Sequence, residues 1–218
     1  MAADPTRTDA SDPEAGGTGR GEGDPPDTTQ LGLFPLHAVL VPGAAMGLRV
    51  FEPRYLDLVG ECGRHGRGFG VCLILEGEEV GAPVAPAAFG TQALIEDFGT
   101  GEDGLLTLRV RGARRFHAQR VRVRNNGLQY ADVVWCAPDP VEPVRPEHGL
   151  QVTLLERLLD HAGGEHAKAA REHFDDAAWV GWRLTELLPL QDLQRQQVLQ
   201  IDDPHRRLDL LVALLPDF

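Results

Sequence analysis

The chain has 218 residues but only one lysine, Lys168, and one serine, Ser11. Because Ser11 lies near the N-terminus, the rest of the chain offers no serine nucleophile, with or without a lysine base. A phosphate-binding loop needs glycine directly before its lysine, whereas alanine precedes Lys168. The glycines at 63, 66, 68 and 70 also lack the GxGxxG spacing of a dinucleotide site. The sequence therefore excludes serine-nucleophile hydrolases and P-loop NTPases.

Cysteines and long apolar runs are also scarce. The three cysteines, Cys62, Cys72 and Cys136, show no CxxC spacing, which argues against a disulfide framework and a zinc site. Cys72 lies within the apolar run FGVCLIL, so we predict a buried strand thiol. No apolar run is long enough to span a bilayer, and the N-terminus has no apolar signal core. We therefore expect a cytoplasmic protein with no metal, no cofactor and no membrane partner.

The net charge of -12 is unevenly distributed. Residues 1–29 contain seven acidic residues and two arginines, so this segment contributes 2 - 7 = -5, and the remainder carries -7. The segment is also rich in Gly, Pro and Thr with little to bury, which predicts a disordered acidic tail over 1–29. Negative charge on the remainder disfavours general nucleic-acid binding, because phosphates repel it unless a basic face is segregated.

Short apolar or alternating runs between residues 31 and 136 predict a strand-rich region. The expected strands are Leu31–Leu36, Ala45–Val50, Phe69–Leu75, Thr91–Phe98, Leu105–Gly112, Phe116–Arg124 and Gln129–Trp135. One helix, from Pro53 to about Cys62 with Gly63 near its end, interrupts them. Asn125, Asn126 and Gly127 favour a tight turn between the last two strands. Several short strands that close on themselves suggest a small barrel.

The C-terminal third has a helical period. The segment Ala137–Pro146 contains four prolines and reads as an extended linker. Beyond it, leucines recur at helical spacing, and Asp203 before Pro204 supplies an N-cap and a first-turn proline for the last helix. We therefore predict an α+β protein with a β-barrel subdomain over 30–137 and a helical bundle subdomain over 138–218.

Several segments resemble one known family. They are LFPLHAVLVPGAAMGLRVFEPRY at 33–55, GRGFGVCLI at 66–74, FGTQALIEDF at 89–98, DGLLTLRVRGARRF at 103–116, LTELLPL at 184–190 and IDDPHRRLDLLVALL at 201–215. In order and spacing they resemble the N-terminal, substrate-recognition domain of Lon proteases, which also occurs as a short stand-alone protein. The resemblance implies a PUA-like β-barrel with one inserted helix, followed by a helical bundle. It also implies recognition of polypeptides, such as unfolded segments or degrons, and no chemistry of its own.

A basic run inside this acidic chain is a candidate anion or partner site. Arginines recur at period two in two expected strands, which places like charges on shared strand faces. The residues are Arg109, Arg111, Arg120, Arg122 and Arg124. Their forked donors suit an acidic peptide, a phosphate or RNA. Alternatively, Glu96, Asp97 or Asp132 on neighbouring strands neutralise a solvated face.

Exposed apolar surface is a second route to function. Val39, Leu40, Val41 and Met46 surround the Pro-Gly turn and could contact an extended apolar peptide, as an edge strand or a shallow groove. Alternatively, they belong to the hydrophobic core.

Three weaker patterns have mainly structural interpretations. The patch His161, Glu165, His166 and His173 lacks the i, i+4 spacing of a helical zinc site and reads as a solvated helix face. Trp179 and Trp182, one turn apart, read as bundle core or as a cage for a cation. A hydrolase or transferase site would need His37 or His117 beside a carboxylate.

The sequence thus favours a non-enzymatic, cytoplasmic polypeptide-binding module, whose partner is an unfolded segment or another protein. The alternative is a PUA-like module that binds RNA or another anion through its arginine strands. Nucleic acid is the less favoured partner because of the net negative charge.

Overall fold

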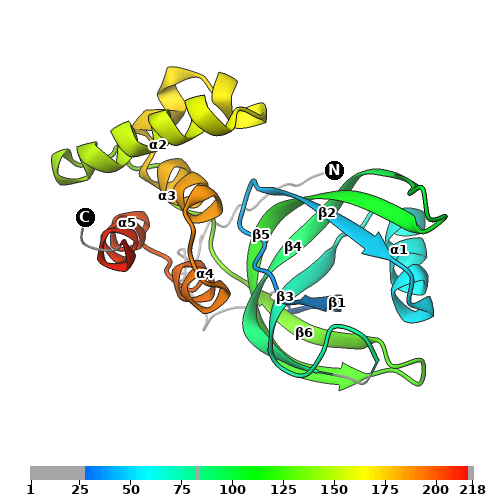
Figure 1. The fold of residues 1–218 in the computed structure, drawn as a ribbon. Helices are drawn as coiled ribbons and strands as arrows, with labels where there is room; N and C mark the ends of the chain where they lie inside the picture. The colour runs from blue at the N-terminus through cyan, green and yellow to red at the C-terminus, as the bar shows by residue number, and fades with distance from the viewer. Residues whose placement is uncertain (1–27, 82–83, 216–218) are drawn as a thin grey trace, which may run out of the picture.

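The computed structural model describes residues 28–81 and 84–215, so the predicted tail at 1–29 lies almost wholly outside the described residues. In these ranges the chain is a mixed α+β fold with a six-stranded sheet and five α-helices (Figure 1). The strands are β1 (Thr28–Leu36), β2 (Ala45–Val50), β3 (Phe69–Glu76), β4 (Ala85–Thr100), β5 (Leu106–Val123) and β6 (Gln129–Trp135). None of the described helices is long and apolar enough to cross a membrane.

The sheet closes on itself. Its strand order is β2-β5-β4-β3-β1-β6, and β6 also pairs with β5, so five strands form a closed circuit and β2 is attached outside it. Strands β1 and β3 are parallel, and every other named pair is antiparallel. Because β2 pairs with β5 alone, its other edge has no partner strand among the described residues.

Strand β5 corrects the prediction of two separate strands at 105–112 and 116–124. It runs unbroken from Leu106 to Val123 and pairs with β4 along most of its length. Its first half also pairs with β2 and its second half with β6. Gly112 lies where the partner changes, and a Cβ atom there would be 2.2 Å from the carbonyl oxygen of Val41. The glycine therefore permits close backbone approach instead of ending the strand.

Helix α1 (Pro53–His65) is one turn longer than predicted. The helix ends at Gly66, whose left-handed φ of 59° suits glycine, and not at Gly63. Its buried face includes Tyr55 and Leu58, as the spacing predicts. The ring of Tyr55 stacks on Phe34 with centroids 4.1 Å apart, which fixes α1 against β1.

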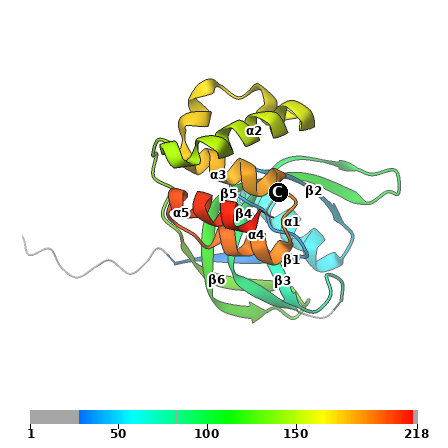
Figure 2. The ribbon, with the colours of Figure 1, turned by 60° about the vertical axis from the view of Figure 1, so that its left-hand side comes forward.

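The remaining helices pack together on one side of the strands, opposite α1 (Figures 1 and 2). They are α2 (Gly149–Ala162), α3 (Ala177–Leu187), α4 (Asp192–Leu199) and α5 (Pro204–Leu214), with short 3₁₀ segments η1 (Pro146–His148), η2 (Glu165–Lys168) and η3 (Arg171–Asp175). The Asp203 carboxylate accepts hydrogen bonds from the backbone N–H groups of His205 and Arg206 at 2.8 and 3.1 Å. This confirms the predicted cap of the last helix.

Strands and helices share one core. The main cluster of buried apolar side chains contains Leu40 and Val110 from the strand region together with Leu184 and Leu211 from the helices. A smaller cluster around Leu33 fills the part of the strand circuit closed by β6. The division into subdomains at residue 137 stays a prediction, since the hydrophobic contacts continue across it.

The cysteines are free thiols. Cys72 is fully buried in β3, which confirms the predicted strand thiol, and burial raises its pKa to about 12. Burial also raises the pKa of Cys62 to about 11. Both side chains therefore remain protonated near neutral pH and act as small apolar groups.

Candidate functional site

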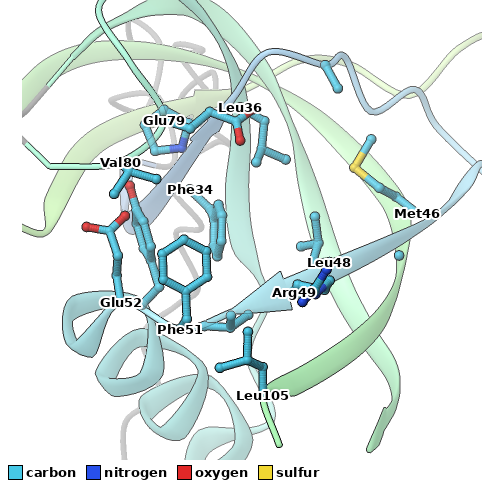
Figure 3. Close-up of a pocket in the computed structure, with 15 residues that line it drawn as sticks. Phe34, Leu36, Met46, Leu48, Arg49, Phe51, Glu52, Glu79, Val80 and Leu105 are labelled. Carbon is cyan, nitrogen blue, oxygen red and sulfur yellow. The ribbon is translucent and has the colours of Figure 1, made fainter. Parts of the chain in front are cut away.

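An apolar groove lies between the end of β1, strand β2 and the start of α1 (Figure 3). We call it the β1–β2 groove, and its volume is about 560 Å³. Its lining comprises Phe34, Pro35, Leu36, Ala38, Met46, Gly47, Leu48, Arg49, Val50, Phe51, Glu52, Tyr55, Glu79, Val80 and Leu105. Most of these side chains are apolar, as expected of a site that recognises an apolar ligand.

The floor and the rim of the groove differ in character. Phe34, Leu48 and Tyr55 are buried and form part of the main core. Phe51 and Val80, in contrast, are 49% and 55% exposed although both are large and apolar. Large apolar side chains exposed around a concave surface indicate an interaction site better than scattered ones do.

Two carboxylates stand at the rim. Glu79 accepts a hydrogen bond from the backbone N–H of His37 at 2.6 Å. Glu52 pairs with the buried Arg54 at 3.0 Å and accepts a weaker bond from the backbone of Gly81 at 3.4 Å. These contacts fix both side chains, which border the apolar lining without entering its floor. The rim can therefore attract basic groups while the floor takes apolar ones.

The four apolar residues singled out in the sequence do not lie together in this groove. Met46 lines it, whereas Leu40 and Val41 are only 1% and 2% exposed and belong to the core. All four instead line a smaller hollow of about 210 Å³ between the Pro-Gly turn and helices α3 and α4, where Val39 is half-buried.

Sequence reasoning missed Phe51 and Val80. Phe51 directly precedes Glu52, the N-cap of α1, so its position after an alternating strand could have marked it as an exposed apolar residue. Val80 is isolated in the loop EGEEVG, where no periodicity points to it.

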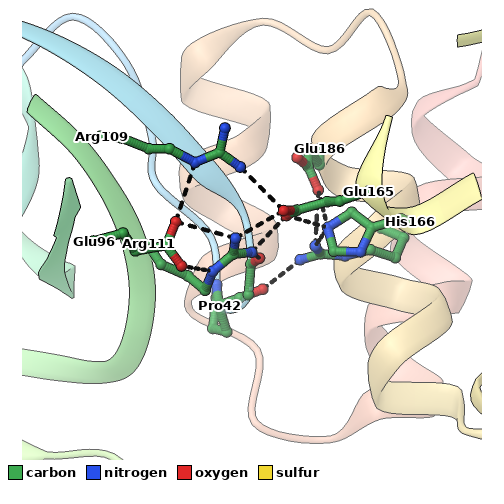
Figure 4. Close-up of polar contacts among 9 residues, drawn as sticks. Pro42, Glu96, Arg109, Arg111, Glu165, His166 and Glu186 are labelled. Atoms are coloured by element: carbon green, nitrogen blue, oxygen red, sulfur yellow. Dashed lines mark hydrogen bonds and ion pairs between the residues drawn. The ribbon is translucent and has the colours of Figure 1, made fainter. Parts of the chain in front are cut away.

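The arginines of β5 are paired with carboxylates (Figure 4). Arg109 contacts Glu96 at 3.2 Å and Glu165 at 3.1 Å, and Arg111 lies between the same two carboxylates, with Nη1 2.5 Å from Glu165. The hydrogen bond from Arg111 lowers the pKa of Glu165 to about 2 and also lowers the pKa of Glu96. The network joins β4 and β5 to η2 in the helical region.

Arg183 extends this network into α3. This residue is 1% exposed, and its guanidinium donates to the carbonyl of Pro42 and pairs with Glu186 at 3.0 Å. His166 lies against the same guanidinium, and burial lowers the pKa of this imidazole. The predicted histidine patch is thus partly built into a contact between strands and helices. Across the described ranges, no group of three or more His, Cys, Asp or Glu side chains is placed to hold a metal ion.

The other candidate arginines also have acidic partners. Arg122 contacts Asp132 at 2.9 Å, Arg120 approaches the same carboxylate at 3.8 Å, and Arg124 contacts Glu61 at 3.0 Å. The structure therefore shows the alternative considered in the sequence analysis, in which Glu96 and Asp132 neutralise the charge of these arginines. An anion site on these strands is not favoured.

The two tryptophans differ in environment. Trp182 is 4% exposed, its ring lies under the guanidinium of Arg207 at 3.5 Å, and its Nε1 donates to Asp139 at 2.6 Å. Trp179 is half-buried and packs on His173 and Phe174. Trp182 therefore belongs to the core and not to an open cation cage.

The histidines considered for catalysis are not paired with carboxylates among the described hydrogen bonds and ion pairs of their side chains. The ring of His117 packs against Phe89 with centroids 4.7 Å apart, and His37 contributes its backbone N–H to Glu79. Neither arrangement provides the base and orienting group that a nucleophilic mechanism needs.

Comparisons with known proteins agree with this architecture. Residues 30–217 match the family described as "ATP-dependent protease La (LON) substrate-binding domain", and this match covers no ATPase or protease domain. The crystal structure of a Lon N-terminal domain protein from Xanthomonas campestris is 57% identical, has a TM-score of 0.74, and covers 86% of this chain and 99% of its own. The N-terminal domain of Lon protease from Mycobacterium avium complex shares the fold, with a TM-score of 0.62 at 15% identity, and covers 85% of this chain and 97% of its own. No curated protein matches the chain. Because the family match spans nearly all of the described residues, this chain belongs to the Lon substrate-binding domain family.

Proposed function

We propose that this chain is a non-enzymatic, cytoplasmic module that recognises polypeptides by binding an extended, unfolded segment in the β1–β2 groove. Family membership supports this proposal, since a protease acts on polypeptides and the matched domain is the one named for substrate binding. We interpret the closed circuit of strands as the PUA-like barrel of the family, and α2–α5 as its bundle. The observation that carries the proposal is the concave apolar surface with the half-exposed side chains of Phe51 and Val80.

The charges around the groove define its occupant. Glu52 and Glu79 border the lining, which also contains Arg49 paired with Asp103, and residues 30–218 carry a net charge of -7. A segment that combines apolar residues with Lys or Arg complements both the lining and the rim. The chain's own residues 1–29 carry -5 and do not complement the rim. The occupant is therefore an apolar, basic segment of another polypeptide.

Replacing one exposed aromatic side chain tests the proposal. Phe51→Ala removes the apolar ring from the lining without adding charge, so the peptide loses apolar contact and its affinity should fall by about fivefold to tenfold. The probe is a fluorescein-labelled eight-residue peptide of alternating Val and Lys, whose affinity is measured by fluorescence anisotropy.

The matched control is Phe98→Ala. Phe98 is 73% exposed on β4 and borders a different hollow beside α1, so this variant should bind the peptide within about twofold of wild type. Equal losses in both variants, or no binding of the peptide by the wild-type chain, would contradict the groove as the recognition site.

A further inference from the structure

The β1–β2 groove follows a strand edge that has no partner among the described residues. β2 pairs with β5 on one side only and stands at the end of the strand order. Across the groove, β6 pairs with β1 only over residues 28–32, so residues 33–36 of β1 continue along that edge after β6 has ended. The groove is lined by both segments, so it runs beside the open edge of β2 and residues 33–36 of β1 (Figure 3).

The hydrogen-bond phase of β2 shows which backbone groups are open. The N–H of Gly112 in β5 donates to the carbonyl of Ala44 at 2.9 Å, and the register continues from Ala45 opposite Arg111 to Val50 opposite Leu106. Antiparallel strands alternate residues that bond the partner with residues that do not.

This alternation directs the backbone groups of Met46, Leu48 and Val50 toward β5. The backbone groups of Ala45, Gly47 and Arg49 therefore point to the open edge.

The side chains agree with this phase. Leu48 and Val50 are buried, whereas Gly47 and Arg49 are exposed. A Cβ atom on Gly47 would meet no other atom within 4 Å, so the outward face of the strand is open at that residue. Exposed strand edges with free N–H and C=O groups pair readily with another chain unless they are blocked.

We infer that β2 receives the bound polypeptide as an added β-strand in the β1–β2 groove, with alternate side chains on the apolar floor and in solvent. The inference rests on the proposed function, because it assigns the binding mode of the same groove. The six residues of β2 extend about 20 Å, which suits an extended segment of about six residues. The favoured segment alternates apolar with basic residues, and it lacks proline, which cannot donate to the ladder.

Backbone methylation of the Val-Lys peptide tests the binding mode. Valine side chains should occupy the floor and lysines should face outward into solvent, on the face where Arg49 is paired with Asp103. In an antiparallel arrangement the lysine amides then donate to β2, and in a parallel arrangement the valine amides do.

Two peptides, N-methylated at every lysine or at every valine, therefore report on different edges. One peptide should lose about tenfold or more in affinity and the other less than about threefold, because each lost backbone hydrogen bond weakens binding by a factor of a few. Which peptide loses affinity gives the strand direction. Equal losses below about threefold would overturn strand addition while leaving groove binding in place. Equal losses of about tenfold would show backbone hydrogen bonds at both peptide edges and would overturn pairing with β2 alone. Absence of binding by the unmodified peptide would overturn the proposed function itself.

A substitution in the protein gives an independent measurement. Gly47→Pro removes one N–H from the open edge and no bond to β5, so affinity for the unmethylated peptide should fall about threefold to tenfold. Gly47→Ala adds a methyl group in open space and keeps the N–H, so it should bind at least about threefold more tightly than Gly47→Pro. Equal affinity of the two variants, with unchanged circular dichroism spectra, would overturn the inference.

Discussion

The β1–β2 groove and the contact between strands and helices differ in where their charged side chains lie. Between strands and helices, Arg115, Arg183 and Arg207 are almost completely buried, and each guanidinium contacts a carboxylate. In the groove, apolar side chains form the floor and carboxylates stand only at the rim. The arginines of this acidic chain therefore serve largely to position its own elements, while the surface left open for a partner is mainly apolar.

The largest expected effect concerns Asp139, which lies in the linker before the helices. Its carboxylate accepts hydrogen bonds from Arg207 at 2.7 Å and Trp182 at 2.6 Å, and lies 3.4 Å from Arg115. Asp139→Ala leaves two buried guanidinium groups without this partner, which should lower the free energy of unfolding by about 3–5 kcal/mol. Urea denaturation measures the change.

Asp202→Ala is the matched control. Asp202 also pairs with Arg115, at 3.0 Å, but its side chain is 79% exposed, so its loss should cost less than about 1 kcal/mol. If both variants have the same small effect, buried charge pairing does not hold the helices on the strands, and the comparison between the two regions fails.

Much of the fold could be predicted because local patterns agree with it. The positions of the strands other than β5, the Asn-Asn-Gly turn and the Asp203 cap follow from alternation, positive φ and capping chemistry. The bounds of β4 do not, since it runs over Ala85–Thr100 where Thr91–Phe98 was predicted. β5 was predicted as two strands because Gly112 reads locally as a break. Gly112 instead leaves room for the carbonyl oxygen of Val41, which lies 71 positions earlier in the sequence. No local sequence pattern can reveal a contact between residues so far apart.

The candidate site was harder to predict than the fold. The spacing of the arginines marked them in the sequence. Their partners Glu165, Asp132 and Glu61 come from three different elements, so only the tertiary structure shows that the arginine charges are neutralised. The groove likewise needs three elements to meet, and Val80 in a loop without periodicity contributes to it. Apolar residues near the Pro-Gly turn pointed to the right region of the chain, although only Met46 among the four lines the groove.

A smaller effect is expected from Glu165, which joins η2 to the arginines of β5. Its pKa in the folded protein is lowered to about 2 from an ordinary 4.5, so its contribution to stability is complete above about pH 5 and is lost as pH falls toward 2. Because the side chain is 38% exposed, solvent screening limits this contribution to less than about 1 kcal/mol.

Glu165→Gln should therefore be slightly less stable than wild type at pH 7, and the difference should shrink between pH 5 and 2. Thermal unfolding over this range measures it. A difference that grows on acidification would show that Glu165 is better stabilised when protonated and that the network is not held by charge.

The smallest effect concerns the rim of the groove. Glu79→Gln keeps an oxygen to accept the His37 backbone N–H but removes one negative charge. Exposed charges interact weakly, so affinity for the Val-Lys peptide should fall about twofold to threefold at low ionic strength. At about 1 M salt the loss should disappear, because charges are then screened beyond about 3 Å. Glu147→Gln, on η1 and outside the groove, removes the same charge and should change affinity less. A loss of affinity that persists in high salt would mean that Glu79 acts through its contact with the His37 backbone and not through its charge. That result would contradict the description of the rim as an acidic border that attracts basic groups.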